Sequence, residues 1–150
     1  MVPVAIALGS NLGDRERHLR EAAKRLEASL GDLQLSSFHE TEAEGVGVQP
    51  KFLNAAAVGK TALTADALLA ELLAIERALG RERPYWGAPR IVDLDLILYD
   101  RAVIEVPSLT VPHPRFRDRR FVLAPLAEVA SDWVDPVSGR TIRALLEALG

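Results

Sequence analysis

Residues 90–99 read RIVDLDLILY, and this stretch decides how the rest of the chain is interpreted. Its apolar residues predict a buried strand, and because side chains alternate across a strand, Asp93 and Asp95 share one face. Aspartate is depleted from strands, and carboxylates at i and i+2 lie only about 6.5–7 Å apart. Ile91 and Ile97 share that face, so it is not simply a polar, solvated surface. The pair of negative charges therefore needs an explanation.

A bound cation is the explanation that the residue types favour. Two ionised carboxylates at this spacing repel each other unless a cation or an arginine lies between them. Oxygen ligands select a hard cation. Mg²⁺ fits best because it keeps bound waters and is coordinated by substrate phosphates as well as by protein carboxylates. A solvated strand face is the alternative for an arbitrary Asp-x-Asp pair. The apolar neighbours favour the metal and, through it, a polyphosphate ligand.

Arginines are concentrated around this strand. Residues 81–120 contain eight of the fifteen arginines, no lysine and six acidic residues, so this segment carries +2 and the rest of the chain −5. Guanidinium groups bind phosphate oxygens bidentately, which favours a phosphate ligand here, although a single surface arginine is more often only solvated. His113 lies between two prolines that restrict its backbone and fix where the imidazole points. It is a candidate phosphate donor, with a loop histidine of no function as the alternative.

The hydrophobic pattern along the chain predicts an α+β fold. We expect strands at 4–8, 33–41, 52–60 and 90–99, helices at 14–30, 64–79 and 142–149, and a further apolar segment at 121–130. The order β-α-β-β-α-β matches the split βαβ sandwich of ferredoxin-like folds, followed here by a C-terminal extension and helix. No linker or repeat interrupts the pattern, so we expect one domain over residues 1–150.

Composition narrows the function classes. With 49% hydrophobic and 26% charged residues, the chain has the composition of an ordinary globular protein. The net charge of −3 gives no reason to expect a nucleic-acid or anionic-membrane partner, and no apolar run is long enough to span a bilayer. Cysteine is absent, which excludes disulfides, thiolate metal sites and cysteine nucleophiles. We expect a cytoplasmic monomer that acts on small molecules.

The predicted third strand carries one false motif and one candidate site. Residues 54–61, NAAAVGKT, end like a phosphate-binding P-loop, but Asn54 stands where the first glycine must be and the segment lies in a strand. Phe52 and Asn54 share one face of this strand, where an aromatic plate and an amide would suit a flat heteroaromatic ligand. A phenylalanine that belongs only to the core is the alternative.

These features together resemble the 6-hydroxymethyl-7,8-dihydropterin pyrophosphokinase family over essentially the whole chain. The segments that carry the resemblance are ALGSNLGD, SSFHET, QPKFLNAA, IERALGRER, GAPRIVDLDLILY and LTVPHPRFRDRRFVLAPLAEVA. The Pro-Arg-x-x-Asp-Leu-Asp and Val-Pro-His elements at this separation are specific to it. The resemblance implies that a diphosphoryl group moves from ATP to the hydroxymethyl oxygen of the pterin, with release of AMP, in folate biosynthesis.

The resemblance also implies a role for each matching residue. Two Mg²⁺ ions would be held by Asp93 and Asp95, which are catalytic together with Arg81, Arg83 and Arg90. The residues implied to bind ATP are Glu76, Arg83, Arg90, His113 and Arg119, with Arg81 also at the triphosphate. The residues implied to bind the pterin are Phe52 and Phe121, which would sandwich it, Asn54 at its polar edge, and Thr41, which would close the pocket.

Two other functions stay open from the residues alone. A metal-dependent nucleotidyl transferase or nuclease could also carry Asp-x-Asp on a ferredoxin-like sheet, but it would need a broadly basic groove, and the net charge of −3 argues against one. A small-molecule regulatory module on the same fold predicts no Mg²⁺ dependence and leaves Asp93 and Asp95 unexplained.

Overall fold

The computed structural model describes residues 1–41, 51–80 and 91–150. Within these ranges no helix is long and apolar enough to cross a membrane. The elements, in chain order, are β1 (Val2–Ser10), α1 (Arg15–Ser29), β2 (Gly31–Leu35), β3 (His39–Thr41), β4 (Phe52–Thr61), α2 (Ala65–Gly80), β5 (Asp93–Tyr99), β6 (Ile104–Val106), β7 (Leu109–Val111), the 3₁₀ turn η1 (Phe116–Asp118), α3 (Arg120–Ala130) and α4 (Ile142–Ala148).

The main sheet has the strand order β2-β4-β1-β5, and the short strand β3 also pairs with β4. All of these pairs are antiparallel. Strand β4 lies between β1 and β2, which are joined through α1, and this is the split βαβ arrangement that the sequence predicts. The ferredoxin-like fold is therefore confirmed. The separate β6–β7 hairpin was not predicted.

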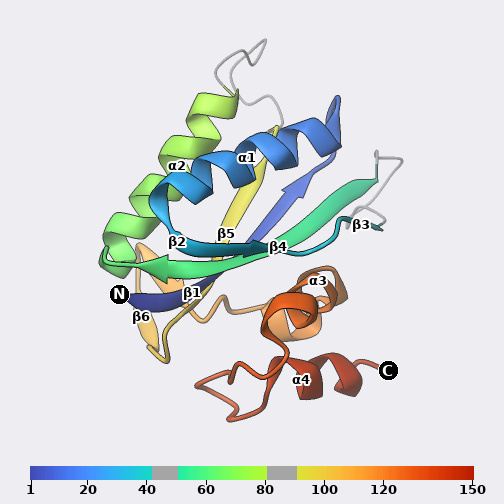
Figure 1. The fold of residues 1–150 in the computed structure, drawn as a ribbon. Helices are drawn as coiled ribbons and strands as arrows, with labels where there is room; N and C mark the ends of the chain where they lie inside the picture. Colours follow the sequence, from blue (N-terminus) through green and yellow to red (C-terminus); the bar gives the residue numbers. More distant parts are fainter. Residues whose placement is uncertain (42–50, 81–90) are drawn as a thin grey trace.

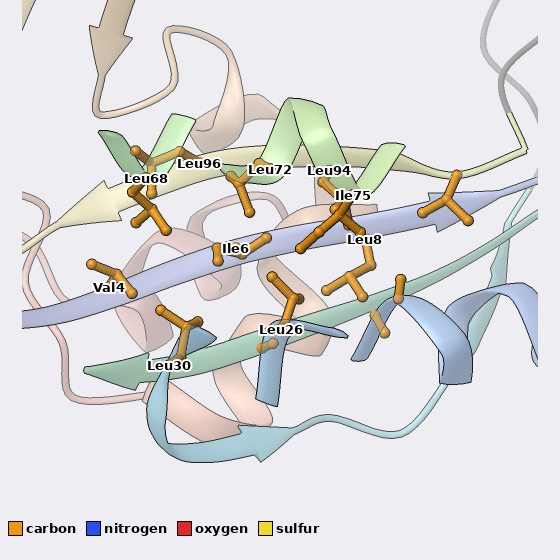
Figure 2. Packing of buried hydrophobic residues seen from close by; sticks show 14 of the residues in the cluster. Val4, Ile6, Leu8, Leu26, Leu30, Leu68, Leu72, Ile75, Leu94 and Leu96 are labelled. Atoms are coloured by element: carbon orange, nitrogen blue, oxygen red, sulfur yellow. The ribbon is translucent and has the colours of Figure 1, made fainter. Parts of the chain in front are cut away.

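Helices cover both faces of the sheet, α1 and α2 on one and α3 and α4 on the other (Figure 1). On the first face, Ile6 of β1 packs among leucines of the two helices, including Leu26 and Leu72 (Figure 2). Full burial of such a side chain stabilises the fold by about 1.5–3 kcal/mol. On the second face β1 presents only small residues, Ala5 and Ala7, against the C-terminal layer. The predicted C-terminal extension therefore forms a third layer.

Strand β5 departs from the predicted alternation near its end. Asp93 and Asp95 share a face as predicted, but a register shift opposite β1 brings Leu98 beside Ala5. Strict alternation would place Leu98 on the same face as Leu94. Because of the shift, Leu98 packs with the α3 layer instead. A β-bulge of this kind adds one residue to one strand and reverses the facing of the residues after it.

The single strand predicted at 33–41 is wrong, because the structure has two strands there. Ser36 ends the first by bonding to β4 out of the regular ladder: its backbone N–H donates to the Ala56 carbonyl, and its hydroxyl accepts from the Ala56 N–H, both at 2.8 Å. The first predicted strand is also longer than expected, since β1 continues through Gly9 to Ser10.

A buried ion pair anchors the segment between β7 and α3. Asp135 is 0% exposed, and its carboxylate accepts hydrogen bonds from Nε and Nη2 of Arg117 in η1, at 2.5 and 2.8 Å. It also accepts from the Val137 N–H and from the N–H and hydroxyl of Ser138. Burial raises the pKa of the Asp135 carboxyl, but the hydrogen bonds outweigh this effect and lower the pKa from 3.8 to about 2.

This pKa predicts how stability depends on pH. A carboxyl whose pKa is lower in the folded state stabilises the protein above the unfolded pKa and loses that contribution as the pH falls through the folded pKa. We expect Asp135→Asn to lower the free energy of unfolding at pH 7, and the deficit relative to wild type to shrink by about 2 kcal/mol between pH 5 and pH 2. Urea unfolding of both proteins across this range measures it. A deficit that does not change with pH would contradict the ion-pair assignment.

Candidate active site

The sheet register places the predicted site residues side by side. Gly9 in the central strand β1 lies opposite Asn54 of β4 on one side and opposite Asp93 of β5 on the other. Ala7 likewise lies opposite Asp95. Residues directly opposite each other in antiparallel strands project from the same face, and two strand spacings separate Asn54 from Asp93 by about 10 Å. The amide and the carboxylates therefore share one face of the sheet.

A cavity of about 440 Å³ opens at this face. Its walls bring together residues from every part of the predicted site: Thr41, Phe52 and Asn54 from β3 and β4, Glu76 from α2, Asp93 and Asp95 from β5, and Arg119 and Phe121 from the entry to α3. Sequence reasoning missed other residues that line it, among them Gly9, Leu69, Leu73 and Val122.

Gly9 allows the amide to lie over the central strand. Asn54 is buried, and its Nδ2 donates to Thr41 Oγ1 at 2.6 Å, which fixes the orientation of the amide. A Cβ at Gly9 would lie 3.1 Å from Asn54 Oδ1 and 3.6 Å from Phe52 Cδ1. Gly9 lies inside β1, and a glycine inside a strand often marks a place where another group approaches the backbone closely.

Phe121 lies on the α3 side of the same cavity, where Arg119 is beside it. The guanidinium carbon of Arg119 is 5.4 Å from the centre of the Phe121 ring, within the range of a cation–π contact. The cavity therefore has an aromatic ring on each side, Phe52 from the sheet and Phe121 from α3, with a cation adjoining the second ring.

Neighbouring polar groups fix the start of β5. The Ser10 hydroxyl donates to the Ile91 carbonyl at 2.6 Å, just before the two aspartates. Glu76 Oε2 accepts from the Leu94 N–H at 2.7 Å, so a carboxylate of α2 caps a backbone donor of β5 between Asp93 and Asp95. Strand β5 is at the edge of the sheet, where such donors have no strand partner.

The donor set fits a magnesium ion that is shared with a ligand. Asp93 is half-buried and Asp95 is exposed, both on the cavity side of β5. Across residues 1–41, 51–80 and 91–150, no group of three or more carboxylates and histidines could hold a metal ion by itself. Mg²⁺ is typically held by one or two carboxylates, with waters and substrate phosphates completing its shell. The described residues match that incomplete donor set.

His113 lies just outside the cavity wall, with its backbone N–H donating to the Ile97 carbonyl at 3.1 Å. Burial lowers the pKa of its imidazole, Arg119 and Arg115 lower it further, and Asp95 opposes them. The imidazole is therefore neutral at pH 7. Nδ1 accepts a hydrogen bond from the Arg115 N–H, so the proton lies on Nε2, which can donate to an anion.

The arginines predicted to contact phosphate separate into three groups. Arg119 lines the cavity, whereas Arg117 is held by Asp135 and Arg120 donates to the Gly150 carbonyl at 2.9 Å. A phosphate role for Arg117 and Arg120, which the concentration of arginines favoured, is therefore not supported. The three arginines that precede the Asp-bearing strand in the sequence lie outside the described residues: Arg81, Arg83 and Arg90.

Comparison with known proteins gives matches over most of the chain. Residues 5–131 match the model of the family described as 7,8-dihydro-6-hydroxymethylpterin-pyrophosphokinase (HPPK). The 2-amino-4-hydroxy-6-hydroxymethyldihydropteridine pyrophosphokinase of Bacillus subtilis is 48% identical over 126 residues, which cover 83% of this chain and 75% of that protein. The protein of the same name from Methylorubrum extorquens is 40% identical over 151 residues, which cover 99% of this chain and 94% of that protein.

Solved structures share the fold. The crystal structure of a Plasmodium falciparum HPPK-DHPS triple mutant superposes with a TM-score of 0.78 at 15% sequence identity and covers 98% of this chain. This chain spans only 44% of that longer protein. The family match over most of the chain and the identity to full-length relatives show that this protein is a member of the 7,8-dihydro-6-hydroxymethylpterin-pyrophosphokinase family.

Proposed function

We propose that residues 1–150 form one pyrophosphokinase domain whose cavity binds the pterin on the β4 side and the ATP triphosphate on the β5 side. Family membership gives the reaction, transfer of diphosphate from ATP to the hydroxymethyl group of 6-hydroxymethyl-7,8-dihydropterin in folate biosynthesis. The observation that carries the assignment of the two subsites is the ladder in which Gly9 separates Asn54 from Asp93.

The pterin subsite follows from the two aromatic walls. A flat ring placed between Phe52 and Phe121 would stack on both, with its edge toward the Asn54 amide that lies over Gly9. Because Thr41 accepts from the amide nitrogen of Asn54, the amide oxygen of Asn54 is directed over β1 and can accept from an N–H at the edge of the pterin.

The triphosphate subsite follows from the charges around β5. Asp93 and Asp95 would hold two Mg²⁺ ions, which neutralise charge on the triphosphate and on the attacking hydroxyl when they are bound. The Arg119 guanidinium and the Nε2–H of His113 would bind phosphate oxygens, together with Arg81, Arg83 and Arg90 from outside the described residues. Glu76 would contact the nucleotide from α2, held in place by its bond to Leu94.

At the β-phosphorus one bond forms and one bond breaks, and the attacking hydroxyl gives up its proton to solvent. The pterin hydroxyl oxygen attacks the β-phosphorus, and the bond from that phosphorus to the α–β bridging oxygen breaks, so that AMP leaves and the β- and γ-phosphates move together. Arg119 and His113 would hold the unit that moves, while the stacked pterin presents its hydroxyl in line. We also propose that the enzyme works in the cytoplasm as a monomer, with these two small molecules as its ligands and no nucleic-acid or membrane partner.

The carboxylates can be tested one at a time. Asp93→Asn and Asp95→Asn should each lower kcat by about 100-fold or more, because a bound cation would no longer neutralise the negative charge of the transition state. The fold should survive, since removing one of two repelling charges relieves strain. Calorimetric titration with Mn²⁺ and a non-hydrolysable ATP analogue should show fewer ions bound than in wild type.

Asp100→Asn is the matched control. Asp100 immediately follows β5 with a φ of 51°, which asparagine tolerates, and it does not line the cavity. Its turnover should stay at the wild-type level. Near-normal Mg²⁺-dependent turnover in Asp93→Asn or Asp95→Asn would overturn the metal assignment.

The aromatic walls give a second test. Phe52→Ala and Phe121→Ala should each weaken pterin binding by roughly 1–3 kcal/mol through lost stacking and burial, while ATP binding barely changes. Equilibrium titrations of each ligand measure both. Trp133→Ala is the control, since Trp133 packs against the core but does not line the cavity. Equal losses for ATP and pterin would show that Phe52 or Phe121 supports the fold or the nucleotide instead.

A further inference from the structure

The carboxylate of Glu128 joins α3 to the segment that carries β3. Its Oε1 accepts from the Ser37 backbone N–H and its Oε2 from the Ser37 hydroxyl, both at 2.8 Å. Oε2 is also hydrogen-bonded to Nε2 of His39, the first residue of β3. We call this set of contacts, made by Ser37, His39 and Glu128, the β3–α3 clasp. None of the three residues lines the cavity.

On both α3 and β3, a clasp residue projects from the same face as a residue of the cavity wall. Glu128 is seven residues after Phe121, so both project from one face of α3, about 10 Å apart along the helix. His39 is two residues before Thr41, so both project from one face of β3, about 7 Å apart. A shift of β3 relative to α3 would therefore move Thr41 relative to Phe121.

Strand β3 is also held to β4. Three of its residues pair with β4, with Thr41 opposite Phe52, and Thr41 Oγ1 accepts from Asn54 Nδ2 at 2.6 Å. On its other face, Glu40 forms an ion pair with Arg15 of α1 at 2.7 Å, and Arg15 also donates to the Lys51 carbonyl at 2.8 Å. These bonds hold β3 to α1 and to the start of β4. Among the contacts that the structure describes, the clasp is what holds it to α3.

The clasp carries a charge at neutral pH. Burial raises the pKa of the Glu128 carboxyl, but hydrogen bonds from Ser37 and His39 outweigh it and hold the pKa below its usual value. Glu128 is thus an ionised acceptor, and hydrogen bonds to a charged group are stronger than those between neutral groups. Such a bond can hold a short strand in place.

We propose that Glu128 is a positioning residue for the pterin subsite, acting through Ser37 and His39 to set the separation of Thr41 from Phe121. The inference rests on the proposed function, which makes Thr41 and Phe121 walls of that subsite. It assigns Glu128 no contact with either substrate. It also predicts a selective effect, because the clasp controls the β3 side of the cavity and leaves Asp93 and Asp95 of β5 undisturbed.

The test is a graded series of variants, each titrated with 6-hydroxymethyl-7,8-dihydropterin in the presence of Mg²⁺ and a non-hydrolysable ATP analogue, and with the analogue alone. Glu128→Ala should weaken pterin binding about tenfold and leave binding of the analogue within about twofold of wild type. Ser37→Ala, which keeps the backbone N–H contact, should weaken it less. Glu128→Gln should give an intermediate affinity, because its amide oxygen can accept from one Ser37 donor but its NH2 group cannot replace the second acceptor.

Glu16→Ala is the matched control, since it removes the Glu16–Arg20 ion pair within α1, away from the cavity. Its pterin affinity should equal that of wild type. Wild-type pterin affinity in Glu128→Ala, or an equal loss for the ATP analogue, would overturn the positioning role. If Glu128→Ala does not fold, Ser37→Ala decides instead, and its pterin affinity must then fall below that of wild type.

Phe121→Ala separates this inference from the function on which it rests. A loss of pterin affinity in Phe121→Ala but not in the clasp variants would refute the positioning role and leave the subsite assignment intact. Unchanged pterin affinity in Phe121→Ala would refute the subsite assignment itself.

Discussion

The repulsion between Asp93 and Asp95 is the constraint around which the site is arranged. Two carboxylates on one face of a strand are unfavourable unless a cation lies between them or water reaches them. In this fold the two carboxylates lie on the edge strand β5, at the wall of an open cavity, where Asp95 is exposed. The strand itself is held by the Ser10 hydroxyl on the Ile91 carbonyl and by Glu76 on the Leu94 N–H.

The small residues of β1 make the rest of the site possible. On the helix-covered face β1 carries Ile6 and other large side chains that fill the core, whereas the opposite face carries Ala5, Ala7 and Gly9. The C-terminal layer packs against the alanines, and beyond them Gly9, which has no side chain, lets the Asn54 amide lie over the strand at the wall of the cavity. One strand thus supplies both a packing surface and the floor of a ligand site.

Much of this could be predicted because it depends on local periodicity. The strand and helix patterns gave the ferredoxin-like order, and alternation along residues 93–95 was enough to put both aspartates on one face. The resemblance to the family then pointed to residues distant in sequence, such as Thr41 and Phe121, that the fold brings into one cavity.

The features that sequence reasoning missed arise from contacts between distant segments. The bulge that turns Leu98 toward α3 depends on the register with β1, and the break between β2 and β3 depends on Ser36 bonding to Ala56. Arg117 belongs to the arginine-rich segment 81–120, and nothing local in the sequence indicates that Asp135, eighteen residues later, holds it. Gly9 falls outside the strand predicted at 4–8, because its role appears only once β4 and β5 lie beside it.

In the proposed reaction the cavity directs the pterin hydroxyl to the β-phosphorus of ATP, with the carboxylates of β5 on the triphosphate side. Phosphorus NMR of the completed reaction with Mg²⁺, ATP and the reduced pterin distinguishes attack at this phosphorus from attack at its neighbour. We expect AMP and a diphosphorylated pterin in equal amounts, with no free ADP. ADP together with a monophosphorylated pterin would mean attack at the γ-phosphorus, and it would contradict the proposed reaction.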